Sequence, residues 1–173
     1  GKSIFLDDHE ARSLVNEIDK AVMLLSSRKI GALLVFERDM GLNDISATGV
    51  QIDGLITADF LMNVFIPNTP LHDGAAIIRG KRLIAAGCLL PLTENRTLST
   101  ELGTRHRAAI GLSEQCDALI IVVSEETGTV SAAENGRIVR HLSSEHLKSY
   151  LRPIFVPKTT GFKDMVLNWR KGK

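Results

Sequence analysis

The sequence predicts a single α/β domain in which helices flank a central mixed β-sheet. Its 173 residues fit one domain. Apolar runs of strand length alternate with segments of helical periodicity, and two pairs of these runs are joined by short turn sequences typical of antiparallel hairpins. Hydrophobic residues make up 44% and charged residues 24% of the chain. These values are near globular averages and exclude a disordered chain, a collagen and a disulfide scaffold.

The first half of the chain predicts a helix, a buried strand, a long loop and a short second helix, in that order. Apolar residues at three- and four-residue spacing predict a helix over 7–26, with Asp7 or Asp8 as its cap. The continuous apolar run 31–36 suits a strand buried on both faces. Polar residues, glycine and asparagine predict a loop over 39–54, and Thr57 is a candidate cap for a short helix over 58–65.

The second half predicts two hairpins, one further strand and two helices. The expected segments are a hairpin of 75–78 and 83–90, a helix over 104–115, a strand over 117–123, a hairpin of 130–133 and 137–140, and a helix from Ser143 or Ser144 to Leu151. We therefore expect a folded domain over 1–152 and a basic C-terminal extension over 153–173.

Charge, cysteine content and hydropathy narrow the class of protein further. Lys and Arg number 21 and Asp and Glu number 20, giving a net charge of +1. Such a balance argues against nucleic acid as a partner. Cys88 and Cys116 lie in apolar surroundings without a C-x-x-C motif, which favours buried thiols in a reducing compartment. No apolar run approaches the roughly 20 residues that span a bilayer. Because the chain opens on Gly1-Lys2-Ser3, we expect the natural protein to extend upstream.

Three polar segments lie beside predicted strand ends or helix starts, where α/β proteins build sites. The first is His72-Asp73-Gly74-Ala75, which follows a loop with two prolines. Asp-Gly is a common turn pair, so a plain turn is one interpretation. The other is a carboxylate held at a strand entry, with glycine letting a ligand approach the backbone.

The second segment, Gly103-Thr104-Arg105-His106-Arg107, clusters cationic residues at a predicted helix start. Two guanidinium groups and a helix N-terminus suit a polyphosphate. Residues two apart face different ways on a helix, so Arg105 and Arg107 need not contact the same phosphate. A capped helix with surface arginines is the alternative.

The third segment, Ser124-Glu125-Glu126-Thr127-Gly128, follows the most apolar strand. Its hydroxyl and carboxylate groups suit a phosphate and a divalent cation, although a hydrophilic turn has the same composition. The segment from His141 to His146 fits no zinc-protease spacing and is expected at the surface. The chain has no Walker A loop, no G-x-G-x-x-G, no G-x-S-x-G and no kinase motif set.

These three segments together resemble the diadenylate cyclase (DAC) domain, whose signatures are an Asp-Gly-Ala and an Arg-His-Arg motif. Both motifs are intact at 73–75 and 105–107, and the segments 30–38, 65–75, 102–109 and 123–128 are also similar to this family. The similarity extends over roughly residues 10–150, and three motifs in order are more specific than any one. Within the family, the chain looks most like the membrane-anchored bacterial type.

The resemblance implies an enzyme that condenses two ATP molecules into cyclic di-AMP with loss of two pyrophosphates. Each domain would hold one ATP, so catalysis would require a face-to-face homodimer. It also implies a divalent metal (Mn²⁺, Mg²⁺ or Co²⁺), a membrane anchor through N-terminal helices, a place at the cytoplasmic face of the bacterial membrane, and possible regulatory protein partners.

The resemblance also assigns roles to individual residues. Asp73 would bind the metal and help deprotonate the 3′-hydroxyl, with Glu126 preferred to Glu125 as the second metal carboxylate. The remaining expected nucleotide contacts are Gly74 and Ala75 at the ribose and phosphates, Gly103, Thr104, Arg105, His106 and Arg107 at the β- and γ-phosphates, Ser124 and Glu125 at the terminal phosphate, His72 at the metal or a phosphate, and Leu90 at the adenine.

Three other functions are consistent with parts of this pattern. A sensory module would bind ATP or a cyclic dinucleotide without turnover, but damaged motifs would then be expected. A phosphohydrolase or simple nucleotidyltransferase would not need a dimer. A purely structural domain would not cluster these residues at strand ends.

Overall fold

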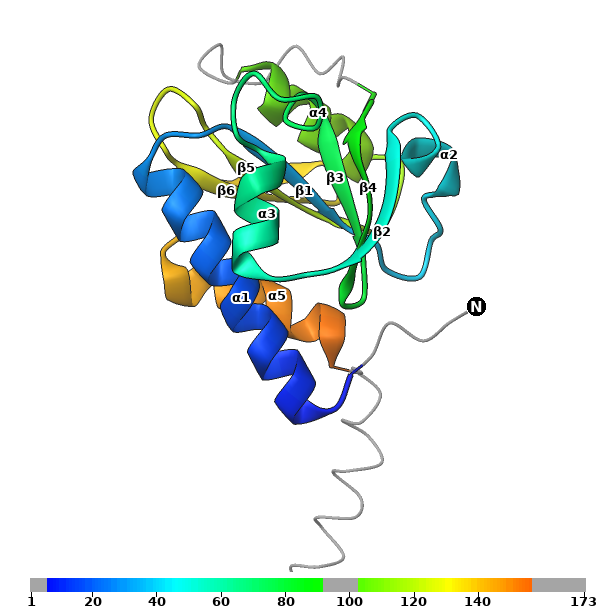
Figure 1. Cartoon of the computed structure of the whole chain (residues 1–173), viewed down its shortest axis with the longest axis vertical. Coiled ribbons are helices and arrows are strands. Elements are labelled where there is room, and N and C mark those ends of the chain that lie inside the picture. The colour runs from blue at the N-terminus through cyan, green and yellow to red at the C-terminus, as the bar shows by residue number, and fades with distance from the viewer. Residues whose placement is uncertain (1–5, 92–102, 157–173) are drawn as a thin grey trace, which may run out of the picture.

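A computed structural model of the chain describes residues 6–91 and 103–156. These residues form a seven-stranded mixed sheet flanked by helices (Figure 1), which confirms the predicted fold class. The helices are α1 (Asp8–Ser27), α2 (Asn43–Ser46), α3 (Ala58–Val64), α4 (Thr104–Ser113) and α5 (Ser144–Phe155). The strands are β1 (Ala32–Phe36), β2 (Val50–Leu55), β3 (Ala75–Arg79), β4 (Arg82–Cys88), β5 (Leu119–Val123), β6 (Val130–Glu134) and β7 (Arg137–Val139).

The strand order is β2-β4-β3-β1-β5-β6-β7. Only β1 and β3 pair in parallel, and the other described pairs are antiparallel. The central strands β1 and β5 are buried along their whole length, as their continuous apolar sequences predict. Both expected hairpins are present, as β3–β4 and β6–β7.

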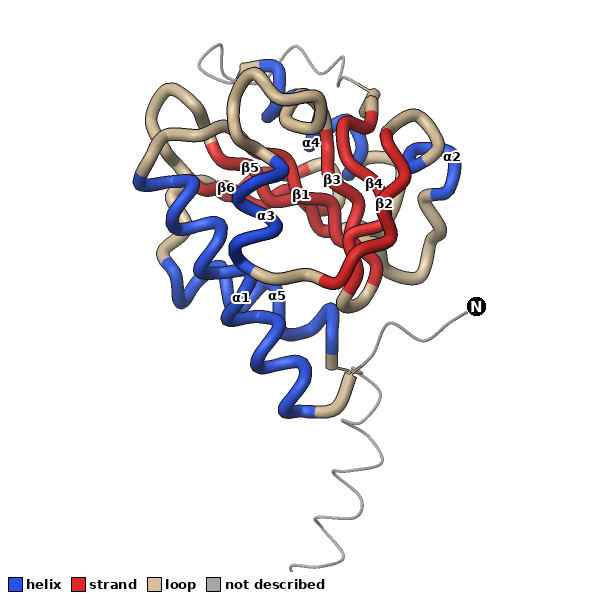
Figure 2. The backbone as a smooth tube through the Cα atoms, viewed as in Figure 1, coloured by secondary structure: helices blue, strands red, loops and turns tan. Residues whose placement is uncertain are grey.

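Helices cover both faces of this sheet (Figure 2). The apolar residues of α1, α3 and α5 pack against one face, where Phe36 and Phe155 meet edge to face at 6.3 Å. Those of α4 pack against the other face with Leu33, Val35 and Ile120. Two of the predicted caps are confirmed: the Asp7 carboxylate accepts from the Glu10 amide, and the Thr57 hydroxyl accepts from the Phe60 amide.

The strand directions bring four chain segments to one end of the sheet. β1 and β5 are antiparallel with Ala32 opposite Val123, so the start of β1 lies beside the end of β5. β3 runs parallel to β1 and starts at the same end. Ala75 pairs with Cys88, which places the end of β4 beside the start of β3. The residues just outside these strands therefore meet at one place.

The predicted loop over 39–54 is wrong, because it contains α2 and β2. β2 is an edge strand that pairs only with β4, and its register is interrupted between Gln51 and Gly54. Its residues are mostly exposed, so the strand lacks the apolar alternation by which a sequence reveals one. Tertiary pairing with β4 creates it instead.

The last helix extends beyond the predicted end at Leu151. α5 begins after the Ser143 cap and continues through Pro153 to Phe155, where Ile154 and Phe155 are buried in the core. The packed part of the chain thus crosses the expected boundary between 152 and 153, because burial of two large side chains outweighs the hydrogen bond that proline removes. Residues 157–173 of the expected extension lie outside the described residues.

Two further expectations concern the thiols and the surface histidines. Cys88 is buried and Cys116 is half-buried, and both are free thiols. His141 and His146 are exposed, as expected. Within the ranges 6–91 and 103–156, no helix has the length and apolar character needed to cross a bilayer.

Candidate active site

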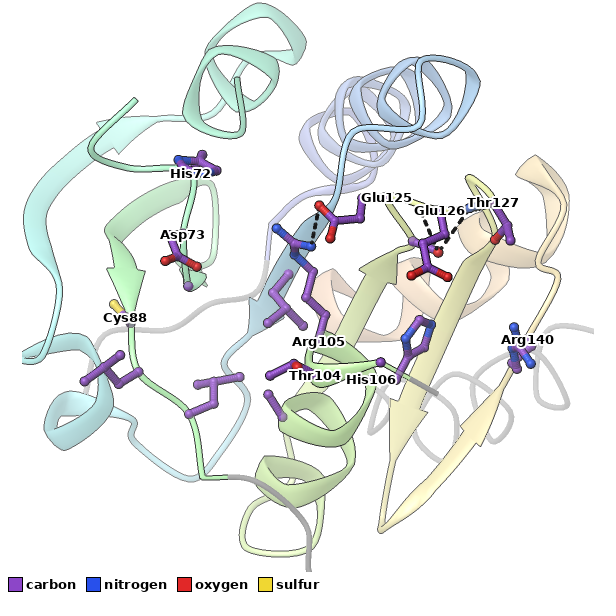
Figure 3. A pocket seen from close by; sticks show the side chains of 17 residues that line it. His72, Asp73, Cys88, Thr104, Arg105, His106, Glu125, Glu126, Thr127 and Arg140 are labelled. Atoms are coloured by element: carbon purple, nitrogen blue, oxygen red, sulfur yellow. Dashed lines mark hydrogen bonds and ion pairs between the residues drawn. The ribbon is translucent and has the colours of Figure 1, made fainter. Parts of the chain in front are cut away.

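A cavity of about 860 Å³ opens at the end of the sheet where β1 and β3 begin and β4 and β5 end. It gathers the three polar segments singled out in the sequence (Figure 3). The predicted residues that line it are His72, Asp73, Gly74, Leu90, Gly103, Thr104, Arg105, His106, Ser124, Glu125 and Glu126. Thus segments up to about 50 positions apart in the sequence share one cavity.

Asp73 and His72 reach this cavity from the loop that enters β3. Asp73 is exposed there, so its carboxylate is accessible to a ligand. The Nδ1 atom of His72 lies 2.6 Å from the carbonyl oxygen of Thr69. Because a carbonyl only accepts, Nδ1 carries the proton in this contact and Nε2 is the atom left for a ligand.

Position 74 requires glycine for a structural reason, in addition to the expected close approach of a ligand to its backbone. Its φ of +109° lies in the region that side chains rarely adopt. A Cβ there would also lie 2.6 Å from the carbonyl oxygen of Cys88 and 2.8 Å from the carbonyl carbon of Gly87. The backbone at Gly74 therefore lies tightly against the end of β4. This close contact fixes the position of the neighbouring Asp73.

The N-terminus of α4 opens into the cavity. Gly103 is its N-cap and supplies no side-chain hydrogen bond to the first turn. Gly103, Thr104 and His106 all line the cavity, so the free amides of this ten-residue helix are close to it. A helix N-terminus attracts anions through these amides and its dipole.

Arg105 holds its guanidinium group within the cavity by pairing with Glu125. Nη1 of Arg105 lies 3.3 Å from Oε2 of Glu125, which comes from the turn after β5 (Figure 3). The Glu125 side chain is 65% exposed and that of Arg105 is 23% exposed. An exposed pair of this kind is weak, so an anionic ligand can replace the Glu125 carboxylate at little cost.

His106 is buried beside two guanidinium groups. Its side chain is 5% exposed, and within the described part of the chain its Nε2 atom has no hydrogen-bond partner. Burial, and then the charges of Arg140 and Arg105, lower the pKa of His106 below its ordinary value of 6.5. His106 therefore faces the cavity as a neutral imidazole at neutral pH.

We expect this lowered pKa to make the protein less stable in mild acid. In the unfolded chain the imidazole binds a proton near pH 6.5, whereas the folded protein resists that proton to lower pH. As the pH falls below that value, the free energy of unfolding should drop by up to about 1.4 kcal/mol per pH unit from this group. Urea unfolding between about pH 7.5 and pH 5.5 should show a smaller drop for His106→Gln, and equal drops would contradict the assignment.

The turn after β5 presents a hydroxyl that can only donate to a ligand. The Ser124 Oγ atom accepts from the amides of Glu126 and Thr127 at 3.2 and 3.3 Å. Since both lone pairs are then in use, the remaining hydrogen is free to point at an acceptor such as a phosphate oxygen. Glu126 lines the cavity from this same turn.

Two predicted site residues do not line the cavity. Ala75 is fully buried within β3. Arg107 follows Arg105 by two positions on α4, and this spacing turns it away from the wall that Arg105 forms. The expected contacts of both residues with the same nucleotide are therefore not supported by their positions.

The sequence also missed residues that the fold brings to the cavity. They are Leu33, Cys88, Leu89, Ala108 and Arg140. Leu33, Leu89 and Leu90 form an apolar wall, and Leu89 is 71% exposed. Arg140 follows β7 and carries no motif, so only the order β5-β6-β7 reveals that a second guanidinium group lines the cavity.

The donor groups of the cavity fit a hard divalent cation. Asp73 and Glu126 offer carboxylates from different walls, and His72 offers Nε2. Among the residues that the structure describes, no three His, Cys, Asp or Glu side chains form a ready-made metal cluster. Mg²⁺ and Mn²⁺ commonly take one or two carboxylates and complete their shell with substrate phosphates and water.

Comparison with known proteins supports the resemblance seen in the motifs. The family model DAC, described as DisA bacterial checkpoint controller nucleotide-binding, matches residues 19–138. The cyclic di-AMP synthase CdaA of Bacillus subtilis is 47% identical over 159 residues, or 92% of this chain, and this chain spans 58% of that relative's length.

Two solved structures are similar in fold. The crystal structure of a double mutant of DacA from Staphylococcus aureus has a TM-score of 0.84 and 44% identity, covering 86% of this chain and 99% of that one. The structure of a hypothetical membrane spanning protein from Bacillus cereus has a TM-score of 0.72 and 47% identity, covering 74% of this chain and 63% of that one. The family match, the sequence identities and the shared fold agree: this chain belongs to the DAC family of nucleotide-binding domains.

Proposed function

We propose that this chain is the catalytic domain of a diadenylate cyclase, which converts two ATP molecules into cyclic di-AMP and two pyrophosphates. The observation that carries the proposal is the single cavity, in which an exposed aspartate, an open helix N-terminus with Arg105 and His106, and the Ser124 turn all meet. The name of the Bacillus subtilis relative, a cyclic di-AMP synthase, agrees with this function.

The polar side of the cavity is suited to the triphosphate. Free amides of α4, the Arg105 guanidinium and the Ser124 hydroxyl are all donors, as polyphosphate oxygens require. The unpartnered Nε2 atom of His106 can donate a hydrogen bond when it carries the ring proton, and Arg140 adds a positive charge to the lining. The apolar wall of Leu33, Leu89 and Leu90 suits the adenine ring.

The reaction is a double nucleotidyl transfer. In each half, the 3′-oxygen of one ATP bonds to the α-phosphorus of the other ATP. The bond between that phosphorus and the oxygen bridging to the β-phosphate breaks, and pyrophosphate leaves with the electron pair of that bond. Asp73 is placed to hold a cation beside the phosphates and to accept the 3′-hydroxyl proton. Arg105 and the α4 amides stabilise the charge that grows on the leaving pyrophosphate. A bound Mg²⁺, Mn²⁺ or Co²⁺ would neutralise phosphate charge and favour the 3′-alkoxide.

The proposed reaction requires two copies of the chain. Each cavity holds one nucleotide, and each nucleotide supplies both a nucleophile and an electrophile, so two cavities must face each other about a two-fold axis. The membrane-spanning description of the Bacillus cereus relative supports a full-length protein anchored at the membrane. The cytoplasmic face is the proposed place of this domain, since its two free thiols suit a reducing compartment. Regulatory protein partners of that full-length protein are part of the same proposal.

Incubation with ATP and Mn²⁺ over a protein dilution series tests this function. We expect cyclic di-AMP and pyrophosphate, with a yield per subunit that falls on dilution because the catalytic dimer dissociates. Chromatography separates the products. ADP or AMP without the cyclic dinucleotide would identify a hydrolase, and bound but unconverted ATP at every protein concentration would identify a sensory module; either result would overturn the proposal.

A further inference from the structure

We propose that Gly31 is a positioning residue for Arg105. Because Gly31 has no side chain, the Arg105 guanidinium group packs directly against its backbone and is directed into the nucleotide cavity. We call this contact the seat. The expected effect on ATP binding rests on the proposed function, whereas the geometry rests on contacts within the chain. Gly31 lies immediately before β1, whereas Arg105 lies 74 positions later in the first turn of α4.

The geometry leaves no room for a side chain at position 31. A Cβ built there would lie 2.5 Å from Cζ and 3.0 Å from Nε of Arg105, with Nη1 closer still. These three atoms of the guanidinium group are the nearest heavy atoms to that position. Real Cβ contacts essentially never fall below 3.0 Å, so one of the two residues would have to move.

The backbone of Gly31 is the part that cannot move. The Ile30 amide donates to the Leu25 carbonyl at 2.9 Å, which ties the preceding residue to the end of α1. Ala32, on the other side, is paired with Val123 in the centre of the sheet. Gly31 itself is buried. An added methyl group would therefore displace the long Arg105 side chain and leave the sheet intact.

The Nη1 atom, which is the guanidinium atom nearest to position 31, also pairs with Glu125, at 3.3 Å. Arg105 thus contacts both a fixed backbone and an exposed carboxylate that can be exchanged for a ligand. When a phosphate replaces Glu125, Gly31 still defines where the guanidinium stands. A charge-assisted hydrogen bond depends strongly on such alignment.

A double-mutant cycle on ATP affinity tests the seat. We expect Gly31→Ala to weaken ATP binding about tenfold, because the guanidinium loses its alignment with a phosphate. In an Arg105→Ala background the same change should weaken binding less than about twofold, since the clashing atoms are gone. Gly41→Ala is the matched control, because a Cβ there has no atom within 4 Å and it should leave affinity unchanged.

Two further measurements test the seat without relying on turnover and separate it from a general loss of folding. The Nε–H resonance of Arg105, assigned by its loss in Arg105→Ala, should shift in Gly31→Ala and stay in place in Gly41→Ala. If Gly31→Ala lowers the melting temperature, the Gly31→Ala/Arg105→Ala double variant should recover the melting temperature of Arg105→Ala. Additive losses in the cycle, an unmoved resonance, or a double variant that stays destabilised would each overturn the seat.

The outcome is distinguishable from failure of the proposed function. If the unaltered chain makes no cyclic di-AMP, the cyclase proposal fails while the resonance shift and the stability cycle still report on Gly31. If the chain is active and Gly31→Ala behaves like Gly41→Ala in every readout, the cyclase proposal stands and the seat is refuted.

Discussion

Replacing Asp73 by Asn should reduce cyclic di-AMP formation by at least about 100-fold, corresponding to about 3 kcal/mol in the transition state. The asparagine has the same shape but carries no charge to hold a cation and cannot accept the 3′-hydroxyl proton. Asp73 is exposed and the neighbouring Gly74 keeps the strained backbone, so the fold should be unaffected. Product formation over a Mn²⁺ titration measures the effect, and a normal rate at any Mn²⁺ concentration would contradict the role.

Asp59→Asn is the matched control for this substitution. Asp59 is exposed in the first turn of α3 and does not line the cavity. The same loss of one negative charge there should leave turnover within about twofold of the unaltered chain, because exposed charges away from a site act weakly. Thermal unfolding of both variants separates lost chemistry from lost structure.

Arg105→Ala should lower ATP affinity and turnover together, with kcat/KM falling by about 100-fold or more. In the proposed mechanism the guanidinium contacts the phosphates both before and during departure of pyrophosphate, so its loss should affect the ground state and the transition state. Steady-state rates and calorimetric ATP binding measure the two parts. A change in kcat alone would contradict a direct contact with bound ATP.

Arg107→Ala provides the comparison within the same motif. Arg107 does not line the cavity, and the two arginines face different sides of α4. The loss on Arg107→Ala should therefore be at least about tenfold smaller than that on Arg105→Ala. Equal losses on the two substitutions would contradict this prediction and would assign Arg107 a contact with the nucleotide.

Elements with a strong local pattern were predictable from the sequence. α1 has an apolar stripe and an Asp7 cap, and β5 is an uninterrupted apolar run, so each local signal agrees with the final environment. β2 and the end of α5 were not predictable, because each is held by partners far away in the chain. β2 needs its pairing with β4, and residues 153–155 need the pocket that receives Phe155 beside Phe36.

The candidate site divides in the same way. Its charged and polar members stood out because Asp, Arg and Ser beside strand ends or helix starts are the groups that bind phosphates and cations. Arg140 and the apolar wall did not stand out, since an arginine after a short strand and leucines at a strand end are ordinary in any sequence. The positions of Arg105 and Arg107 were also open in the sequence, and the structure includes Arg105 but not Arg107 in the lining of the cavity.

The sequence by itself determined which chemical groups are available for a site, because residue type and local spacing fix hydrogen-bonding capacity, charge and helix starts. It determined the α/β class for the same reason, since apolar periodicity is a local property. Only the tertiary structure decided which of those groups line the same cavity. The contact between Gly31 and Arg105 depends on a sheet register that sets the start of β1 beside the end of β5. Such pairing joins strands that are far apart in the chain, and it is determined by the free energy of the whole fold because no short segment encodes it.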